Sequence, residues 1–274
     1  AAAATATAAA TSEGRNTHGD HVVVREPGVH GLRFGLWLTG EEHIGVFSDS
    51  RPTRELIRSL SKDKRVLNLF SYTGGFGVAA SAGGARCSHN VDSKAPCLAA
   101  AKVNYALNAL DVDPDGRSFQ KADVVRFLNR TAKSTGTRYD LIVVDPPPRF
   151  SRNSDWAYEA ELHTGQLLAM CVGVAAAKGA TLVAGINALT VSDSRFEEMI
   201  AEAAQLSGRS LTARRWIGAG EDFPRCPYRP TARFVELVVG DETETTGVGT
   251  NLAEELGMRD EGGDDDDEGD EGGD

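Results

Sequence analysis

Three aspartates stand where short strand-like segments of the sequence end. Asp92 closes the segment "CSHNVD", Asp123 follows "SFQKA", and Asp145 follows "DLIVV". A carboxylate can accept hydrogen bonds from ribose hydroxyls, from an amino group or from a ring N–H. Ligands of open α/β sheets bind at the carboxyl ends of the strands, so we expect the three carboxylates to point into one crevice. The spacing explains Asp123 equally well as the N-cap of a helix.

A glycine-containing loop precedes the first of these acids. In "VLNLFSYTGGFGVAA" (66–80), an apolar strand runs into Gly74 and Gly75 and then into a helix. Glycines allow the backbone to approach a ligand, and the N-terminus of the helix offers free N–H groups. Asp92 follows Gly74 by 18 residues, where an acid can reach the hydroxyls of a ribose. Because T-G-G-F-G departs from the dinucleotide pattern G-x-G-x-x-G, the loop indicates either a nucleoside ligand or a tight structural turn.

The segment "VVDPPPRF" (143–150) follows the third acid with a rigid loop and an aromatic ring. Prolines fix φ, so their carbonyl oxygens and Asp145 can form a fixed edge of hydrogen-bond acceptors. Phe150 can stack on a nucleic-acid base, a contact worth about 1–3 kcal/mol. The alternative is a strand that simply ends at the prolines, followed by a phenylalanine of the core.

Alternating strands and helices must position these residues. We expect helices over 51–64, 77–84, 95–110, 155–180 (ending at Gly179) and 192–208, with Ser192 as an N-cap and Gly208 near the end of the last. Strands are expected at 65–71, 87–92, 139–145, 181–187, 211–218 and 232–240, and a strand, a turn and a helix within 117–131. This alternation predicts an α/β fold with a mostly parallel sheet and helices on both faces. Strand-like runs at 21–26, 32–38 and 43–48 predict a small N-terminal β-hairpin or meander.

Composition divides the chain into four parts. We expect a disordered Ala/Thr-rich segment over 1–20, a β-hairpin extension over 21–50, a main domain over 51–240 and a disordered acidic tail over 241–274. The tail holds 15 acids and one base, whereas residues 1–240 hold 28 bases and 25 acids, so the body is mildly basic. The N-terminal composition predicts a chloroplast or mitochondrial location, with the cytoplasm as the alternative.

Other classes of protein are disfavoured by the same composition. The four cysteines are scattered without a C-x-x-C pair, which argues against a disulfide framework and a zinc site, and we expect no metal. No apolar run approaches the roughly 20 residues that span a bilayer, so we expect no membrane partner. The sequence leaves the oligomeric state open.

Four segments together resemble the class I S-adenosylmethionine (SAM)-dependent methyltransferases: "VLNLFSYTGGFGVAA", "VDSKAPCLAAAKVNYALNAL", "KADVVRFL" and "YDLIVVDPPPRF". They are most similar to the bacterial 23S rRNA methyltransferases of the cytosine-5 type and their guanine-N7 relatives, as are "GEEHIGVFSDSRPTREL" and "GEDFPRCPY". The resemblance covers roughly residues 30–240, and the family's RNA-binding PUA module has no counterpart in this sequence. It implies a Rossmann-like fold with a seven-stranded sheet, SAM as cofactor and RNA, chiefly ribosomal RNA, as partner.

The resemblance also implies roles for individual residues. The loop around the glycines would hold the methionine part of SAM, Asp92 would bind the ribose, and Asp123 the adenine amino group. Asp49 and Arg51 would lie near the amino-acid end of the cofactor. Asp145, Pro146, Pro147 and Phe150 would form the catalytic loop at the target base. The full set expected to bind the cofactor is Asp49, Arg51, Phe70, Ser71, Tyr72, Thr73, Gly74, Gly75, Asp92, Ser93, Asp123 and Val124.

Two departures from the family bear on the reaction. Cytosine-5 methylation needs a cysteine thiolate to attack the base, but Ile186 stands where that cysteine is expected, so this chemistry is disfavoured. Asn187 is compatible with the guanine-N7 relatives, whose target nitrogen attacks with its own lone pair. Two residues instead of one separate D-P-P from Phe150, which can displace the ring. The alternative is a catalytically inactive protein that binds RNA or assists ribosome assembly.

A phosphate-binding rim is a further expectation. It would consist of arginines near the catalytic loop and in the last third of the domain: Arg149, Arg152, Arg214, Arg215, Arg225 and Arg229.

Overall fold

The computed structural model describes residues 21–27, 31–37, 45–110, 116–134, 136, 138–151, 157–177, 179–223 and 231–242. Its centre is a seven-stranded sheet in the order β10-β11-β9-β6-β3-β4-β5. The strands are β3 (Arg65–Leu69), β4 (Cys87–Asp92), β5 (Arg117–Lys121), β6 (Leu141–Val144), β9 (Ala180–Gly185), β10 (Arg209–Ile217) and β11 (Phe234–Glu242). β11 runs antiparallel to both of its neighbours, β9 and β10, and the remaining neighbouring pairs of this sheet are parallel. The expected mostly parallel, seven-stranded α/β fold is therefore confirmed.

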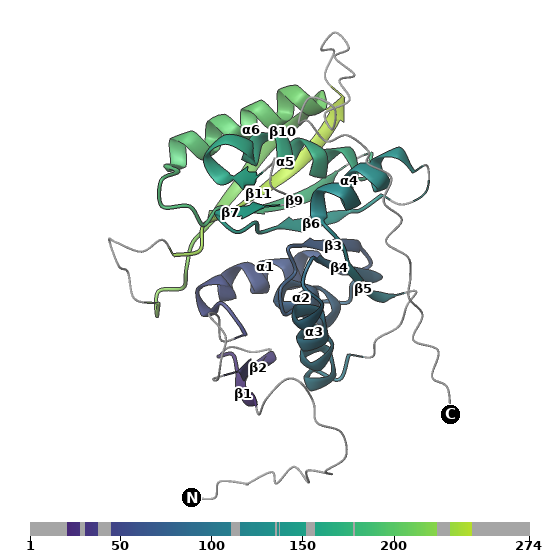
Figure 1. Ribbon diagram of the computed structural model, residues 1–274, viewed down its shortest axis with the longest axis vertical. Helices are drawn as coiled ribbons and strands as arrows, with labels where there is room; N and C mark the ends of the chain where they lie inside the picture. The colour runs from purple at the N-terminus through teal and green to yellow at the C-terminus, as the bar shows by residue number, and fades with distance from the viewer. Residues whose placement is uncertain are drawn as a thin grey trace, which may run out of the picture.

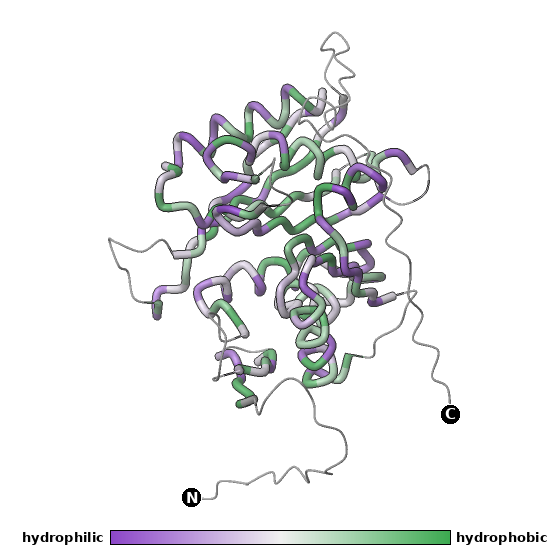
Figure 2. Tube along the Cα trace, viewed as in Figure 1, coloured by the Kyte–Doolittle hydropathy of each residue, from purple (hydrophilic) through white to green (hydrophobic). Residues whose placement is uncertain are grey.

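Three helices cover each face of the sheet (Figure 1). One face carries α1 (Arg51–Leu60), α2 (Gly75–Ala82) and α3 (Ala95–Leu107), and the other carries α4 (Val124–Lys133), α5 (Ala160–Gly173) and α6 (Asp193–Ser207). Alternate residues of β6 point to opposite faces: Leu141 and Val143 pack with the first group of helices, Ile142 and Val144 with the second. Figure 2 shows hydrophobic residues along the central strands, whereas hydrophilic and hydrophobic residues alternate along α6.

The predicted ends of α6 are confirmed. The hydroxyl of Ser192 accepts a hydrogen bond from the backbone N–H of Arg195 at 3.1 Å, as an N-cap should. Gly208 ends the helix with φ 64°, a left-handed conformation that glycine adopts without steric cost.

The predicted helix over 155–180 is wrong at both ends. Strands β7 (Arg149–Ser151) and β8 (Ala157–Glu159) form a small antiparallel sheet, so the helix begins only at Ala160. It stops at Gly173 because the backbone beyond pairs with Tyr139: the N–H of Ala176 donates to the Tyr139 carbonyl at 2.8 Å. Three-residue strands are too short to show a periodicity that could be recognised in the sequence.

The predicted N-terminal hairpin is present as β1 (His21–Arg25) and β2 (Arg33–Trp37). Asn104 of α3 and Asn108, which follows that helix, hold the hairpin in place: the backbone N–H of Gly35 donates to Asn104 at 2.8 Å and that of Arg33 donates to Asn108 at 2.9 Å. Glu26, which follows β1, forms an ion pair with the buried Arg54 of α1. The third strand-like run, 43–48, forms no strand where it is described; residues 48–50 form a 3-10 turn, η1 (Ser48–Ser50).

The polar character of β4 is explained by a buried hydrogen-bond network beneath α3. The Asn90 amide donates to the hydroxyl of Tyr105 at 2.9 Å, and the hydroxyl of Ser88 lies 2.9 Å from the same oxygen. Asn68 of β3 donates to Asn90 at 2.9 Å. Oδ1 of Asn68 is buried without a partner in the described part of the chain, but the side chains of Ser88, Asn90 and Tyr105 are hydrogen-bonded, which lowers the cost of burying this polar strand.

Candidate active site

The loop between β3 and α2 has a strained backbone. Phe70 and Tyr72 have φ values of 53° and 47°, which non-glycine residues rarely adopt, and Gly74 follows with φ 75°. A Cβ added to Gly74 would lie 2.8 Å from Cβ of Ala101 on α3, so only glycine fits there. Such strain persists where the surroundings fix a particular shape, and it is concentrated in functional loops.

This shape presents the N-terminus of α2. Gly74 is the N-cap and has no side chain to accept a hydrogen bond from the first turn. The backbone N–H groups at the start of any α-helix lack intrahelical acceptors and attract a negatively charged group. Beside them, the Ser71 hydroxyl is buried without a hydrogen-bond partner in the described part of the chain. A ligand with a carboxylate fits the vacant donors at this position.

Asp92 holds the same loop from the neighbouring strand. Its carboxylate accepts hydrogen bonds from the backbone N–H of Tyr72 at 2.8 Å and of Lys94 at 2.9 Å. Each bond uses a different oxygen, so each oxygen keeps a lone pair for a further donor. Asp92 is therefore placed both to fix the loop and to accept from a ribose hydroxyl. The neighbouring Ser93 is exposed.

Asp123 lies next to Asp92 because the backbone N–H of Ala122 donates to the Asp92 carbonyl at 3.0 Å. The Asp123 side chain accepts from the backbone N–H of Arg126 at 2.9 Å and caps α4. The helix-cap alternative is confirmed. Val124, the first residue of α4, is buried against the core.

Asp145 lies at the end of β6, on the other side of β3. The Asn187 amide donates to its carboxylate at 2.7 Å. Desolvation by the surrounding protein raises the pKa of Asp145 to about 7, a rise that the hydrogen bond from Asn187 reduces and the nearby charge of Asp49 increases. The residue is only partly exposed; Pro146 beside it is buried and Pro147 is exposed. Near neutral pH this carboxyl exchanges readily between its ionised and protonated forms.

Phe150 connects the loop that contains Pro146 and Pro147 (the proline loop) to the loop between β3 and α2 (the cofactor loop). Its ring centre lies 5.3 Å from that of Phe70, and it stacks on Tyr158 with the centres 4.7 Å apart and the planes 16° from parallel. Tyr158 is buried and its hydroxyl lies 2.9 Å from that of Thr164. One face of Phe150 is thus already occupied, and the ring belongs in part to the core, as in the alternative considered from the sequence.

Asp49 and Arg51 are both engaged with the segment between β10 and β11. Asp49 accepts from the backbone N–H of Ala232 at 2.8 Å, and Arg51 forms two hydrogen bonds, of 2.6 and 2.7 Å, with the exposed Asp222. This ion pair raises the pKa of Arg51 and lowers that of Asp222. Arg51 would have to exchange partners to reach a cofactor carboxylate.

The arginines expected to form a phosphate rim are also paired where they are described. Arg149 pairs with Glu159 across β7 and β8. Nε of Arg215 lies 2.7 Å, and a terminal nitrogen of Arg214 3.7 Å, from the carboxylate of Glu236, whose side chain is fully buried. These arginines remain 55–69% exposed, and Arg214 and Arg215 share one carboxylate, so part of their positive charge stays available at the surface. The remaining three rim residues, Arg152, Arg225 and Arg229, lie outside the described residues.

No described cysteine is placed to attack a base at Asp145. Ile186 follows β9 and is 1% exposed. Cys171 is buried in α5, where desolvation raises its pKa, and Cys87 and Cys97 lie at the start of β4 and in α3. Cys226 lies outside the described residues.

Two residues of the site escaped the sequence interpretation. Tyr158 was hidden within the segment predicted to be helical. Asn104 supports the cofactor loop, since its amide donates to the Thr73 carbonyl at 2.8 Å while its oxygen accepts from Gly35. Its helical neighbours are apolar or small, and a lone buried asparagine among them was the available signal.

The described residues contain no group of three or more His, Cys, Asp or Glu that could hold a metal ion. Within the same part of the chain, no helix has the length and apolar character needed to cross a membrane.

Comparisons with known proteins agree with this geometry. A family model described as S-adenosylmethionine-dependent methyltransferase matches residues 8–216. Ribosomal RNA large subunit methyltransferase I of Tolumonas auensis is 31% identical over 220 residues, covering 80% of this chain and 54% of the relative. Ribosomal RNA large subunit methyltransferase K/L of a Shewanella species is 38% identical over 151 residues, 55% of this chain and 21% of the relative. The chain thus spans about half or less of the length of these bacterial relatives, which give no support to an organelle location.

Solved structures share the fold. The SAM-dependent methyltransferase of Agrobacterium tumefaciens superposes with a TM-score of 0.63 at 22% identity, covering 82% of this chain and 72% of that one. SMU.776, solved as a complex with SAH, superposes with a TM-score of 0.71 at 24% identity, covering 83% and 58%. SAM supplies a methyl group on a positively charged sulfur. The vacant donors of α2 suit its carboxylate and Asp92 suits its ribose. The chain belongs to the S-adenosylmethionine-dependent methyltransferases, with SAM as its cofactor.

Proposed function

We propose that this chain transfers a methyl group from SAM to a base of large-subunit ribosomal RNA. The observation that carries the proposal is the position of Asp145: its partly exposed carboxyl, fixed by Asn187, follows Val144, which pairs with Leu69 at the start of the loop suited to SAM. Methyl transfer needs the acceptor atom in line with the sulfonium methyl group, so catalysis depends mainly on positioning. The names of the bacterial relatives support ribosomal RNA as the substrate.

The proline loop supplies the edge that positions the base. Asp145 accepts a hydrogen bond from an amino group or ring N–H when ionised, and its pKa of about 7 leaves a large ionised fraction at neutral pH. Pro147 is exposed and rigid, so its carbonyl group offers a second fixed acceptor beside it. Because Tyr158 covers one face of Phe150 and Phe70 also contacts the ring, Phe150 supports the proline loop by packing.

The acceptor atom is one that needs no covalent help from a cysteine. Ile186 is buried at the position where a cytosine-5 enzyme would need its thiol, and the adjacent Asn187 is committed to Asp145. A ring nitrogen attacks the methyl group with its own lone pair, which agrees with this arrangement. We therefore place the reaction on a base nitrogen.

The alternative, an inactive RNA-binding or ribosome-assembly protein, is not favoured. Two of the features that suggested it were the missing cysteine and the altered proline loop, and a nitrogen acceptor makes the cysteine unnecessary. The N-terminus of α2 offers backbone N–H groups to a ligand, and the relatives carry the names of enzymes.

The direct test measures transfer of label from tritiated SAM to unmodified large-subunit ribosomal RNA made by transcription. We expect transfer by the wild type and a loss of at least about 100-fold in Asp145→Ala, since the base edge is removed. Asp63→Asn is the matched control, because Asp63 is an exposed acid before β3 at the opposite end of the strands. Failure to bind SAH in calorimetry would overturn the enzyme assignment.

A second measurement addresses the acceptor atom. RNA containing 5-fluorocytosine traps cytosine-5 enzymes as covalent complexes through their cysteine. We expect no covalent complex on a denaturing gel and retained transfer when all four cysteines are changed to serine. A trapped complex would refute the nitrogen acceptor and leave the methyltransferase assignment intact.

A further inference from the structure

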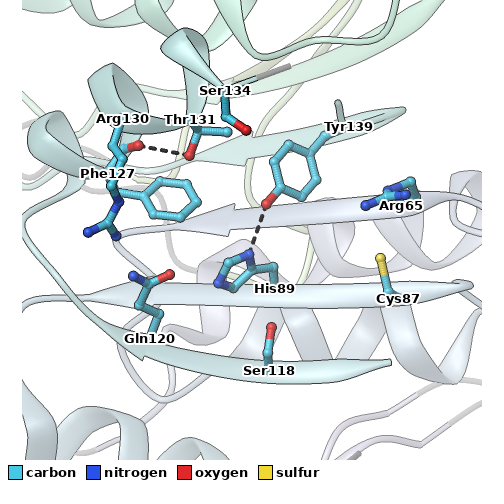
Figure 3. Close-up of a pocket in the computed structure, with 10 residues that line it drawn as sticks. All are labelled: Arg65, Cys87, His89, Ser118, Gln120, Phe127, Arg130, Thr131, Ser134 and Tyr139. Atoms are coloured by element: carbon cyan, nitrogen blue, oxygen red, sulfur yellow. Dashed lines mark hydrogen bonds between the residues drawn. The ribbon is translucent and has the colours of Figure 1, made fainter. Parts of the chain in front are cut away.

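A hollow of about 440 Å³ lies between α4 and the exposed edge of the sheet at β4 and β5 (Figure 3). This volume is within the roughly 300–1,000 Å³ typical of ligand sites. The residues that line it are Arg65, Cys87, His89, Ser118, Gln120, Phe127, Arg130, Thr131, Ser134 and Tyr139. Arg65 and Cys87 begin β3 and β4, whereas Asp92 ends β4 and Asp145 follows β6, at the opposite end of the strands. The hollow is therefore separate from the methyl-transfer crevice.

Two guanidinium groups stand at opposite ends of this hollow, Arg130 at one and Arg65 at the other (Figure 3). Within the described part of the chain neither takes part in an ion pair. Nε of Arg65 is buried and has no hydrogen-bond partner there. Its neighbour Asp140 is bonded to the backbone N–H of Arg65 at 2.9 Å rather than to its guanidinium. Unpaired cations in a concave site call for an anionic ligand.

The middle of the hollow is aromatic and neutral. Nδ1 of His89 lies 2.8 Å from the Tyr139 hydroxyl, and the His89 and Phe127 rings meet edge to face with centres 5.2 Å apart. Burial lowers the pKa of His89, so the ring is uncharged at neutral pH. Ser118 and Gln120 of β5 add hydrogen-bonding groups on the same side. This combination suits a flat heterocycle, whose rim carries donors and acceptors.

The chain segments that carry the lining residues are rich in basic residues. These segments, 61–65, 86–92, 116–134 and 138–140, contain ten Lys and Arg and four Asp. The rest of residues 1–240 contains 18 bases and 21 acids, so the excess positive charge of the body is concentrated here. The negative C-terminal end of α4 also lies here, but Arg138 donates to the Ser134 carbonyl at 3.0 Å and offsets it.

We propose that this hollow is a second RNA site, which takes one nucleotide of a single strand with its base at His89, Ser118 and Gln120 and its flanking phosphates at Arg65 and Arg130. It rests on the proposed function, since it assumes that RNA is the substrate. The site would anchor RNA away from the crevice, at two arginines that take part in no ion pair within the described residues, whereas Arg149, Arg214 and Arg215 are each paired with a glutamate. A free nucleotide shares this chemistry, and the strand is favoured because basic residues extend well beyond the hollow.

The test compares two charge reversals on α4 of the full chain. Arg130→Glu changes a residue that lines the hollow, and Arg126→Glu changes an exposed residue one turn away that does not line it. Binding of a fluorescent ten-nucleotide single-stranded RNA is measured by anisotropy at several salt concentrations. We expect Arg130→Glu to weaken binding about tenfold and to reduce the salt slope by about 0.7, and Arg126→Glu to weaken it less than about threefold. Equal effects of the two variants would overturn the proposal.

A filling variant separates the hollow from the general field of charge. Ser118→Trp places a ring in the hollow without changing charge, and we expect it to weaken RNA binding at least about fivefold with an unchanged melting temperature. Wild-type affinity in this variant, or binding of uridine monophosphate without binding of the RNA strand, would overturn the RNA site. SAH binding, measured by calorimetry, should be unchanged in all three variants. If the wild type does not bind SAH, the proposed function is overturned instead.

Discussion

Replacing Asp145 by asparagine should stabilise the folded protein above neutral pH while it damages methyl transfer. Burial removes water from the Asp145 carboxyl and raises its pKa from 3.8 to about 7. Asparagine has the same shape, and its oxygen can still accept the hydrogen bond that Asn187 donates at 2.7 Å. The variant therefore removes the cost of burying a charge and preserves the packing.

The magnitude and its sign follow from the shift. Below pH 3.8 the carboxyl is protonated in both the folded and unfolded states and costs nothing. As pH rises toward 7 the unfolded state loses its proton first, so the free energy of unfolding falls, and above pH 7 the full cost is present. A shift of about three units corresponds to at most about 4 kcal/mol, and partial exposure of Asp145 reduces our expectation to about 2 kcal/mol.

Urea denaturation of the wild type and Asp145→Asn, at several pH values between about 4 and 8.5, measures this difference. We expect the advantage of the variant to grow from near zero to about 2 kcal/mol across this range, while label transfer to RNA falls by at least about tenfold. A variant that is less stable than the wild type at all pH values would refute the reasoning, since it would show that the ionised carboxylate contributes net favourable contacts.

Three further changes test the supports of the site. Asn104→Ala should lower the free energy of unfolding by about 2–4 kcal/mol and weaken SAH binding, because it leaves buried backbone groups of the hairpin and the cofactor loop unpaired. Asn108 bonds the hairpin but not the loop, so Asn108→Ala should leave SAH binding unchanged in calorimetry. Arg54→Met should cost about 3–5 kcal/mol in urea denaturation because Glu26 loses its buried partner, and a cost below about 1 kcal/mol would contradict that role. The lowered pKa of His89 predicts that wild-type stability falls as pH drops through about 6.5, and His89→Gln should flatten this part of the profile.

The sequence predicted the fold wherever an element was long enough to show its period or its cap. Strand β6 was recognised by its run of apolar residues, and helix α6 by Ser192 and Gly208 at its two ends. Both signals are local and do not depend on neighbouring elements. The segment 155–180 failed because its ends depend on pairing with distant residues. Tyr158 stacks on Phe150 in the small sheet of β7 and β8, and the backbone beyond Gly173 pairs with Tyr139. Contacts between residues far apart in the chain leave no local pattern.

The candidate site was predicted better in its residues than in their partners. Convergence of the acids followed from strand direction alone, so Asp92 and Asp123 could be placed side by side. What each side chain contacts could not be derived, because Arg51 finds Asp222 in a loop 171 residues away, and Arg215 turns to a glutamate buried on the next strand. These pairings depend on the exact approach of loops and strands, which only the folded structure defines.

The position and pKa of Asp145 together restrict how the carboxyl can act. A ring nitrogen that attacks with a free lone pair has no proton to lose, so a carboxylate near it can only orient the base through another donor on the same rim. An exocyclic amine must lose a proton after methylation, and a carboxyl with a pKa of about 7 is well matched to receive it. In the first case ionisation of Asp145 changes KM for RNA, and in the second it changes kcat. The pH profile of the two parameters therefore reports the chemical class of the acceptor nitrogen.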